Sequence, residues 1–241
     1  MNLTRHIYHS ILLVLALTFS AGMPSIVAAD TFAIIGTGRV GSALGKRFTQ
    51  LGHEVVYGSR DPSRESIRTL VSETGGNARA LSPAEAVVDA DIVVLAVPWD
   101  AVGSVIADLG DLSGKIIIDP TNPRVIAADG LYDSPLATSN TAMVQAWAPD
   151  AYVVKALTLV PAEHMLDPNY MDFDFILPIA GDDADAKARV TDLLASMGID
   201  VVDFGKARHA HIIEWLYSSA WNMRNQGYPF RITFEEAPPP R

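Results

Sequence analysis

The fold of this chain is decided by the stretch Gly36-Thr37-Gly38-Arg39-Val40-Gly41, which fits the pattern G-x-G-x-x-G. This pattern binds the pyrophosphate of a dinucleotide when a strand precedes it and a helix follows it. The apolar run Thr31–Ile35 predicts a buried strand before it, and apolar residues recur at helical spacing over Val40–Leu51. These surroundings predict a Rossmann-type nucleotide-binding fold.

Each glycine of the stretch has its own expected role. Gly36 allows the tight turn, Gly38 lets the backbone approach the pyrophosphate, and Gly41 lets the helix pack closely on the strand. Free N–H groups at the start of the helix, together with the helix dipole, then hold the phosphates. We therefore expect all six residues of the stretch to contact the cofactor.

The rest of the chain alternates between predicted strands and helices. Further strands are predicted at Glu54–Tyr57, Ile92–Val97, Ile116–Asp119, Tyr152–Leu157, Phe175–Ala180 and Ile199–Asp203, and helices at Ser63–Thr74, Trp99–Leu109, Asp183–Met197 and Ala207–Arg224. This order predicts an α/β fold with a doubly wound, mostly parallel sheet. Pro178 predicts an edge position for its strand. The many turn residues of Pro120–Ser139 predict loops.

The end of the second strand distinguishes NADP from NAD. An NAD-binding fold usually carries an acidic residue there for the ribose hydroxyls. This strand instead runs into Ser59 and Arg60, which can donate hydrogen bonds to a 2′-phosphate, and Arg64 can add a second positive charge. Asp61 is an opposing acid, but it follows the arginine. We therefore predict NADP(H) as the cofactor.

Two segments are candidates for the nicotinamide pocket, because ligands of open α/β sheets bind at the carboxyl ends of the strands. They are Val97-Pro98-Trp99 and Asp119–Pro123, each at the end of a predicted strand. Their prolines could equally serve only to end those strands. The sequence is equally compatible with a nicotinamide pocket and with prolines that only end the strands.

No catalytic acid or base stands out in the sequence. Glu163 and His164 fall in a predicted loop; they could act in proton transfer, but isolated polar loop residues more often face water, and we expect that here. Tyr152 and Lys155 fall inside a predicted strand. Hydride transfer between two rings depends on alignment more than on acid–base catalysis. The catalytic residues are therefore left unassigned, and a nicotinamide-to-flavin reaction is favoured over an alcohol dehydrogenase.

Composition excludes several other classes of protein. The 241 residues are 49% hydrophobic, carry a net charge of -10 and include no cysteine. No run of lysine and arginine is present, so nucleic acid is not an expected partner. The six histidines lack the spacing of ligand pairs, and we expect no metal site.

Residues 1–29 have the layout of a secretory signal peptide. Arg5 precedes the apolar run Ile11–Phe19, and the small residues Val27-Ala28-Ala29 form a cleavage pattern. The apolar run is shorter than the ~20 residues of a stable membrane span. Residues 30–241 are then a single nucleotide-binding domain, periplasmic or secreted. If Met23 is the true start instead, the protein is cytoplasmic.

Five stretches together resemble the NADP oxidoreductases that depend on the deazaflavin coenzyme F420, and the related reductase domain of the Steap metalloreductases. They are IGTGRVGSAL from Ile35, GHEVVYGSR from Gly52, VLAVPW from Val94, VVKAL from Val153 and LPIAGDD from Leu177. The similarity spans residues 32–234. It departs from the family at Thr158, where such proteins often carry Asn or His, and in the signal peptide.

The resemblance implies an NADP site formed by Thr37, Gly38, Arg39 and Val40, with the 2′-phosphate bound by Ser59 and Arg60 and with Arg64 nearby. It places Trp99 and Pro161-Ala162 beside the nicotinamide. It also implies a small C-terminal helical lobe, about residues 206–234, and a homodimer.

The resemblance favours an NADPH-dependent oxidoreductase that transfers a hydride to a flavin-like or deazaflavin acceptor, with ferric or cupric ions as a further acceptor. One alternative is an imine or keto-acid reductase of the pyrroline-carboxylate reductase type, which needs a larger C-terminal dimer domain than the few residues after His209 can form. The other is a non-catalytic NADP-binding sensor.

Overall fold

The computed structural model describes residues 29–123, 125–133, 137–171, 176–228 and 234. Almost all of the predicted signal peptide, and the proline-rich tail from Pro238 to Pro240, lie outside the described residues. Within the described ranges, no helix is long and apolar enough to cross a membrane.

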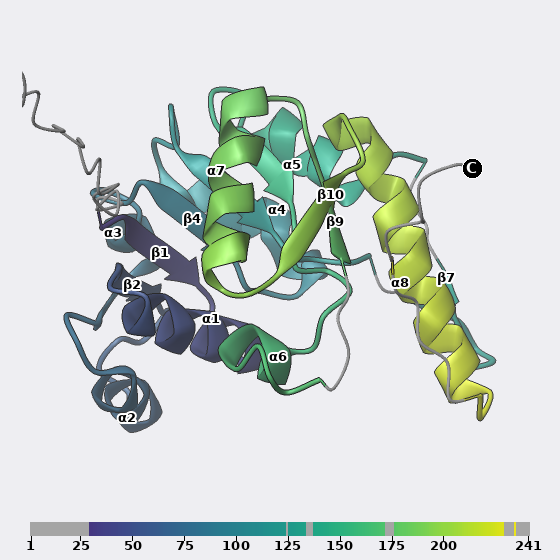
Figure 1. The fold of residues 1–241 in the computed structure, drawn as a ribbon. Coiled ribbons are helices and arrows are strands. Elements are labelled where there is room, and N and C mark those ends of the chain that lie inside the picture. The colour runs from purple at the N-terminus through teal and green to yellow at the C-terminus, as the bar shows by residue number, and fades with distance from the viewer. Residues whose placement is uncertain (1–28, 124, 134–136, 172–175, 229–233, 235–241) are drawn as a thin grey trace, which may run out of the picture.

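An eight-stranded sheet forms the centre of the molecule, with the strand order β10-β9-β8-β5-β4-β1-β2-β3 (Figure 1). Its strands are β1 (Thr31–Ile35), β2 (Glu54–Gly58), β3 (Arg79–Leu81), β4 (Ile92–Leu95), β5 (Ile116–Asp119), β8 (Tyr152–Lys155), β9 (Ile176–Gly181) and β10 (Asp200–Asp203). All neighbours pair in parallel except β8 and β9. Six neighbouring strands of this sheet lie in the order β3-β2-β1-β4-β5-β8, which is the order of a doubly wound Rossmann sheet. This order confirms the predicted fold class.

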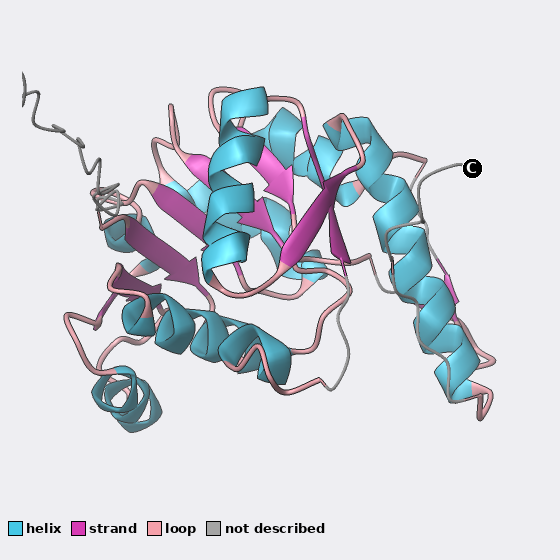
Figure 2. Cartoon of the chain, viewed as in Figure 1, coloured by secondary structure: helices cyan, strands magenta, loops and turns pink. Residues whose placement is uncertain are grey.

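Helices cover both faces of the sheet (Figure 2). One layer contains α1 (Arg39–Gln50), α2 (Glu65–Thr74), α6 (Ala162–Leu166) and α7 (Ala184–Ser196), and the other contains α3 (Pro83–Ala86), α4 (Trp99–Leu109) and α5 (Asn140–Trp147). The continuous apolar character of the strands follows from this arrangement, because successive side chains face opposite layers. In β1, Phe32 and Ile34 face the α1 layer, whereas Ala33 and Ile35 face the α4 layer.

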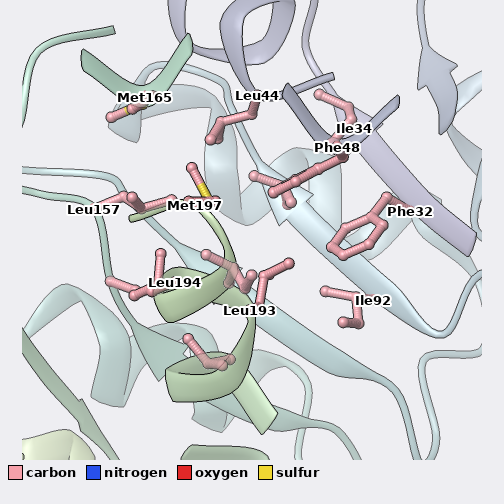
Figure 3. Close-up of a cluster of buried hydrophobic side chains, with 14 of the residues drawn as sticks. Phe32, Ile34, Leu44, Phe48, Ile92, Leu157, Met165, Leu193, Leu194 and Met197 are labelled. Atoms are coloured by element: carbon pink, nitrogen blue, oxygen red, sulfur yellow. The ribbon is translucent and has the colours of Figure 1, made fainter. Parts of the chain in front are cut away.

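The core beneath α1 joins elements that are far apart in the sequence (Figure 3). Phe32 of β1 stacks on Phe48 of α1, with the ring centroids 4.1 Å apart. Leu193 of α7 and Met197, the C-cap residue of that helix, lie in the same buried cluster. This packing sets α1, and therefore the loop that precedes it, firmly against the sheet.

The C-terminal helix extends away from the sheet, as Figure 1 shows. After the short 3-10 helix η1 (Ala207–His209), α8 (Ala210–Asn225) packs beside a hairpin of β6 (Val125–Ile126) and β7 (Tyr132–Asp133). Tyr132 stacks on Trp221 with 5.3 Å between ring centroids, and the Asn222 amide bonds both the N–H and the carbonyl of Tyr132.

The predicted edge position of the strand with Pro178 is wrong, because β9 lies between β8 and β10. The N–H of Ile176 points away from β10, toward Phe234, and the nitrogen of Pro178 two residues later points to the same side. On this side of β9, which faces away from β10, the neighbouring strand β8 pairs only with Ala180 and Gly181 and does not reach Pro178. The proline therefore removes no hydrogen bond from the ladder, which is why an inner strand tolerates it.

Other differences concern short elements. The helices α5 and α6 and the strands β3, β6 and β7 lie where no helix or strand was predicted. The strand predicted to reach Val97 ends at Leu95. Glu163 and His164 lie in α6 rather than in a loop, and His164 is buried, so the expectation that both face water is wrong for the histidine.

Candidate functional site

The loop between β1 and α1 has a geometry that only glycine permits at two positions. Gly36 has φ 112°, and a Cβ there would lie 2.3 Å from the Ala96 carbonyl oxygen. A Cβ on Gly41 would lie 2.0 Å from the Gly36 carbonyl oxygen. The predicted tight turn at Gly36 and close helix packing at Gly41 therefore both have a steric cause in this structure.

The third glycine faces open space. A Cβ on Gly38 would meet no atom of the described residues within 4 Å, although Gly38 is the N-cap residue of α1. Within the described part of the chain, no side chain caps this helix, and its first turn holds no acid, so its first N–H groups lack a partner within the helix. An open backbone surface with unpaired donors at a positive helix end fits a bound pyrophosphate.

The carboxyl end of β2 carries the candidate 2′-phosphate site. Ser59 accepts a hydrogen bond from the N–H of Asp61 at 3.3 Å, which leaves its hydroxyl hydrogen available to a ligand. Among the described residues, no ion pair or hydrogen bond engages Arg60, and its side chain is exposed. The third candidate, Arg64, lies 3.9 Å from the carboxylate of Asp61.

Asp61 organises this turn. The Ser63 hydroxyl donates to its carboxylate at 2.7 Å, and this bond lowers the pKa of Asp61 below its ordinary value, with a smaller contribution from Arg64. Asp61 is therefore an anion that partly neutralises Arg64. The unpaired Arg60 is left as the principal cation at the end of β2.

The segment after β4 lies beside the glycine loop. Val97 approaches Gly36, since its Cγ1 atom would lie 3.0 Å from a Cβ on that glycine. Pro98 is the N-cap residue of α4 and Trp99 is its first residue. The Trp99 ring stacks on Trp147 of α5 with a centroid separation of 5.6 Å. Both roles considered for this segment are thus compatible with its position, because it ends the strand and also borders the loop.

The segment after β8 reaches the same loop through α6. Ala162 begins this helix after the N-cap residue Pro161, and Glu163 forms an ion pair with Arg39 of α1. The pKa of Glu163 is lowered by hydrogen bonds from its own backbone N–H and from Arg39, so the side chain is an anion. The next residue, His164, has a lowered pKa because it is buried, with Asp167 opposing this effect.

Sequence reasoning missed a buried ionic network at the ends of β5 and β8. The ammonium of Lys155 lies 3.0 Å from the Asp119 carboxylate and 3.2 Å from the Glu214 carboxylate, and it donates to the Thr121 carbonyl at 2.6 Å. The side chains of Lys155 and Asp119 have no exposed surface, and that of Glu214 is 2% exposed.

Part of this network carries a sequence signal. A lysine at the end of an otherwise apolar, buried strand requires a counter-ion, and Asp119 ends a neighbouring predicted strand. Glu214 carries no such signal, because it comes from α8 and only the folded chain brings that helix to the sheet.

All predicted site residues follow strands that run in parallel, so the structure brings them to one edge of the sheet. The glycine loop follows β1, Ser59 and Arg60 follow β2, Val97 follows β4, and Ala162 follows β8. The predicted pairing of phosphate loop and 2′-phosphate site is therefore geometrically consistent.

Comparison with known proteins adds to this geometry. Residues 31–123 match the family described as NADP oxidoreductase, coenzyme F420-dependent. An F420-dependent NADP reductase of Methanothermobacter marburgensis is 26% identical over 200 residues, covering 74% of this chain and 85% of that protein. The solved structure of a candidate F420-dependent NADP reductase from Arthrobacter sp. FB24 superimposes with a TM-score of 0.78 at 29% identity, covering 86% of this chain and 100% of that one.

A third relative is much longer. The rat metalloreductase STEAP3 is 28% identical over 188 residues, which make up 77% of this chain. These residues are only 36% of the rat protein. The chain thus corresponds to about a third of that relative.

Proposed function

Because the chain belongs to the family of NADP oxidoreductases that depend on coenzyme F420, we propose that it transfers a hydride between NADP(H) and a flavin-like or deazaflavin acceptor. The chain is an NADP-dependent oxidoreductase. Ferric or cupric reduction is a further activity suggested by the likeness to the rat metalloreductase.

One observation supports the cofactor site above all others. Gly38 presents open backbone at the uncapped start of α1, and the unpaired Arg60 lies at the same sheet edge. The first feature suits the pyrophosphate, and the second suits a 2′-phosphate, which an arginine can bind with two hydrogen bonds. We therefore assign Gly36 to Gly41, together with Ser59 and Arg60, to NADP(H) binding.

The remaining predicted residues would shape the nicotinamide end. Val97 borders the glycine loop, Pro98 follows Val97 as the N-cap of α4, and Ala162 begins the helix that contacts α1. Trp99 is anchored by its stacking on Trp147. Arg64 would add a weaker positive charge, because Asp61 already engages it. When bound, NADPH supplies a hydride to the acceptor, and the chain's own residues contribute anchoring and alignment.

Acid–base groups are not required for this reaction. Glu163 is an anion paired with Arg39, and burial favours the neutral form of His164. Neither is placed as a proton donor. This arrangement favours ring-to-ring hydride transfer over carbonyl reduction, in which the developing alkoxide needs a proton.

The activity is tested by following NADPH oxidation by the purified protein with coenzyme F420, FMN and a ferric chelate in parallel. We expect oxidation with a deazaflavin or flavin, and a much slower rate with NADH. Tight NADPH binding without turnover of any acceptor would favour a sensor. Binding of neither nucleotide would contradict the proposal.

We also propose that the protein forms a homodimer through α8. The outer side of this helix exposes Ile212 and Trp215, with 43% and 53% of their surface accessible. Large apolar side chains in such positions are typical of protein interfaces. Light scattering should give twice the mass of the chain, and a monomer at all concentrations would refute the interface.

A further inference from the structure

The Lys155 network is unusual because it buries three ionisable side chains that play no part in the proposed cofactor site. Taking such groups out of water is costly, and apolar residues of similar volume often serve stability as well or better. The retention of Lys155, Asp119 and Glu214 together therefore suggests a demand on geometry rather than on stability alone.

The network holds the loop after β5 from two sides. The Asp119 carboxylate accepts hydrogen bonds from the N–H and the hydroxyl of Thr121, at 2.9 and 2.5 Å. Lys155 donates to the carbonyl of the same residue. Since every polar backbone atom of Thr121 is engaged, the direction in which the chain leaves it, toward Asn122, is set by the network.

The same network anchors the start of the segment after β8. Two residues beyond Lys155, Leu157 is buried with φ 64°, a left-handed conformation that a non-glycine residue adopts only when its surroundings impose it. Thr158 follows at 5% exposure. The chain then continues to α6, which contacts α1 beside the phosphate loop.

Each of these two segments presents an unsatisfied polar atom three residues after the charged one. Among the residues that the structure describes, no hydrogen-bond partner reaches the Asn122 Oδ1 atom or the Thr158 Oγ1 atom, and both atoms are buried. Buried polar groups without a partner are rare, and they indicate a missing ligand or water. Both atoms lie at the carboxyl edge of the sheet.

We propose that Lys155 is a positioning residue for hydride transfer, holding the segments with Asn122 and Thr158 in the orientation that aligns the nicotinamide ring with its acceptor. The inference rests on the proposed function. Lys155 does not touch either ring itself. Its three hydrogen-bond donors are all used by Asp119, Glu214 and Thr121.

Glu214 extends this control to the C-terminal helix. Its carboxylate accepts from the N–H of Asn140 at 3.0 and 3.1 Å, at the start of α5. Thr141 of the same helix donates to Asp119 at 2.8 Å. The positions of α8 and α5 are thereby tied to the two segments at the site.

The test compares Lys155→Met, the paired apolar variant Lys155→Met/Glu214→Met, and the near-isosteric Glu214→Gln with the wild type. Three quantities are measured: the melting temperature, the NADPH Kd, and the emission spectrum of bound NADPH, which reports the surroundings of the nicotinamide ring. The single-turnover rate of NADPH oxidation by coenzyme F420 or FMN is measured in parallel.

We expect the paired variant to regain part of the stability lost in Lys155→Met, since only the Asp119 carboxylate is then buried without its cation, and to keep the NADPH Kd within threefold of wild type. The emission spectrum of NADPH bound to this variant should still differ from that of NADPH bound to the wild type. Its single-turnover rate of hydride transfer should be at least tenfold lower than that of the wild type. Wild-type emission and rate in the folded paired variant or in Glu214→Gln would overturn the proposal. Failure of all three variants to fold would assign the network to stability alone and would overturn it equally. A wild type that does not bind NADPH would instead refute the proposed function.

Discussion

The two ends of the site are built in opposite ways. At the β1–β2 end, the glycine loop works through backbone atoms: Gly41 packs against the Gly36 carbonyl, and Gly36 packs against the Ala96 carbonyl just beyond the end of β4. At the β5–β8 end, Lys155 works through side-chain charges that come from two strands and the last helix.

This difference fits the role that we propose for each end. Unpaired backbone donors at a helix start suit phosphates, which any NADP-binding protein must hold. A saturated ionic network binds nothing itself, but it resists displacement, because removing any member leaves a buried charge without its partner. The first end therefore suits cofactor binding, and the second suits precise alignment.

The largest expected effect comes from a substitution in the glycine loop, at the β1–β2 end of the site. In Gly36→Ala the new Cβ meets the Ala96 carbonyl at a φ of 112°, so we expect a loss of more than about 4 kcal/mol of stability and no folded protein at 37 °C. Gly38→Ala is the matched control, because its Cβ meets open space. It should melt like the wild type but bind NADPH at least about tenfold more weakly. Equal melting temperatures for both variants would contradict the steric account.

The next largest effect comes from a substitution in the Lys155 network, at the β5–β8 end of the site. Lys155→Met leaves two buried carboxylates without their cation, and urea titration should show a loss of about 3–5 kcal/mol. Lys46→Met is the control, since Lys46 forms a surface pair with Glu73 and should cost about 1 kcal/mol or less. Similar losses in the two variants would mean that the network carries no special energy.

A smaller effect concerns the ion pair that joins the two ends. Glu163→Gln frees Arg39 of α1 and removes a negative charge beside the phosphate loop. Because the Arg39 side chain is largely exposed and that of Glu163 partly exposed, we expect stability to change by less than about 1 kcal/mol and the NADPH Kd to improve about two- to fivefold at low salt. The improvement should vanish in 0.5 M salt. A weaker affinity would show that Glu163 supports the site instead.

The smallest expected effect is a pH dependence of stability, and it comes from His53, which lies outside the candidate site. Burial lowers the pKa of His53 from 6.5, with Asp30 opposing and Arg189 adding to the effect, so the unfolded chain binds more protons below that value. Stability is therefore complete above pH 6.5 and declines as the pH falls through this range. His53→Phe should flatten the decline, leaving the part due to His164. An unchanged slope in His53→Phe would refute the assignment.

The same contrast determines which features of the fold and of the candidate site could be predicted from the sequence. The glycine loop, the alternation of strands and helices that implies a doubly wound sheet, and the position of an arginine after β2 are local patterns, and they could be predicted. The pairing of Lys155 with Glu214 could not, because it depends on where α8 packs. The sequence predicts a loop at Glu163 and His164, because the five residues of this short helix are too few to show helical periodicity. The inner position of Pro178 depends on how far β8 extends along its neighbour.

The most direct test of the account is calorimetric titration of NADPH and NADH into the wild type and Arg60→Ala. Arg79→Ala is the matched control, since it removes the same charge at the start of β3, away from the candidate site. Loss of a charged hydrogen-bond pair at the 2′-phosphate should weaken NADPH about 10- to 100-fold and leave NADH within about twofold. Equal weakening of both nucleotides, or an equal effect of Arg79→Ala, would contradict an NADP site at the end of β2.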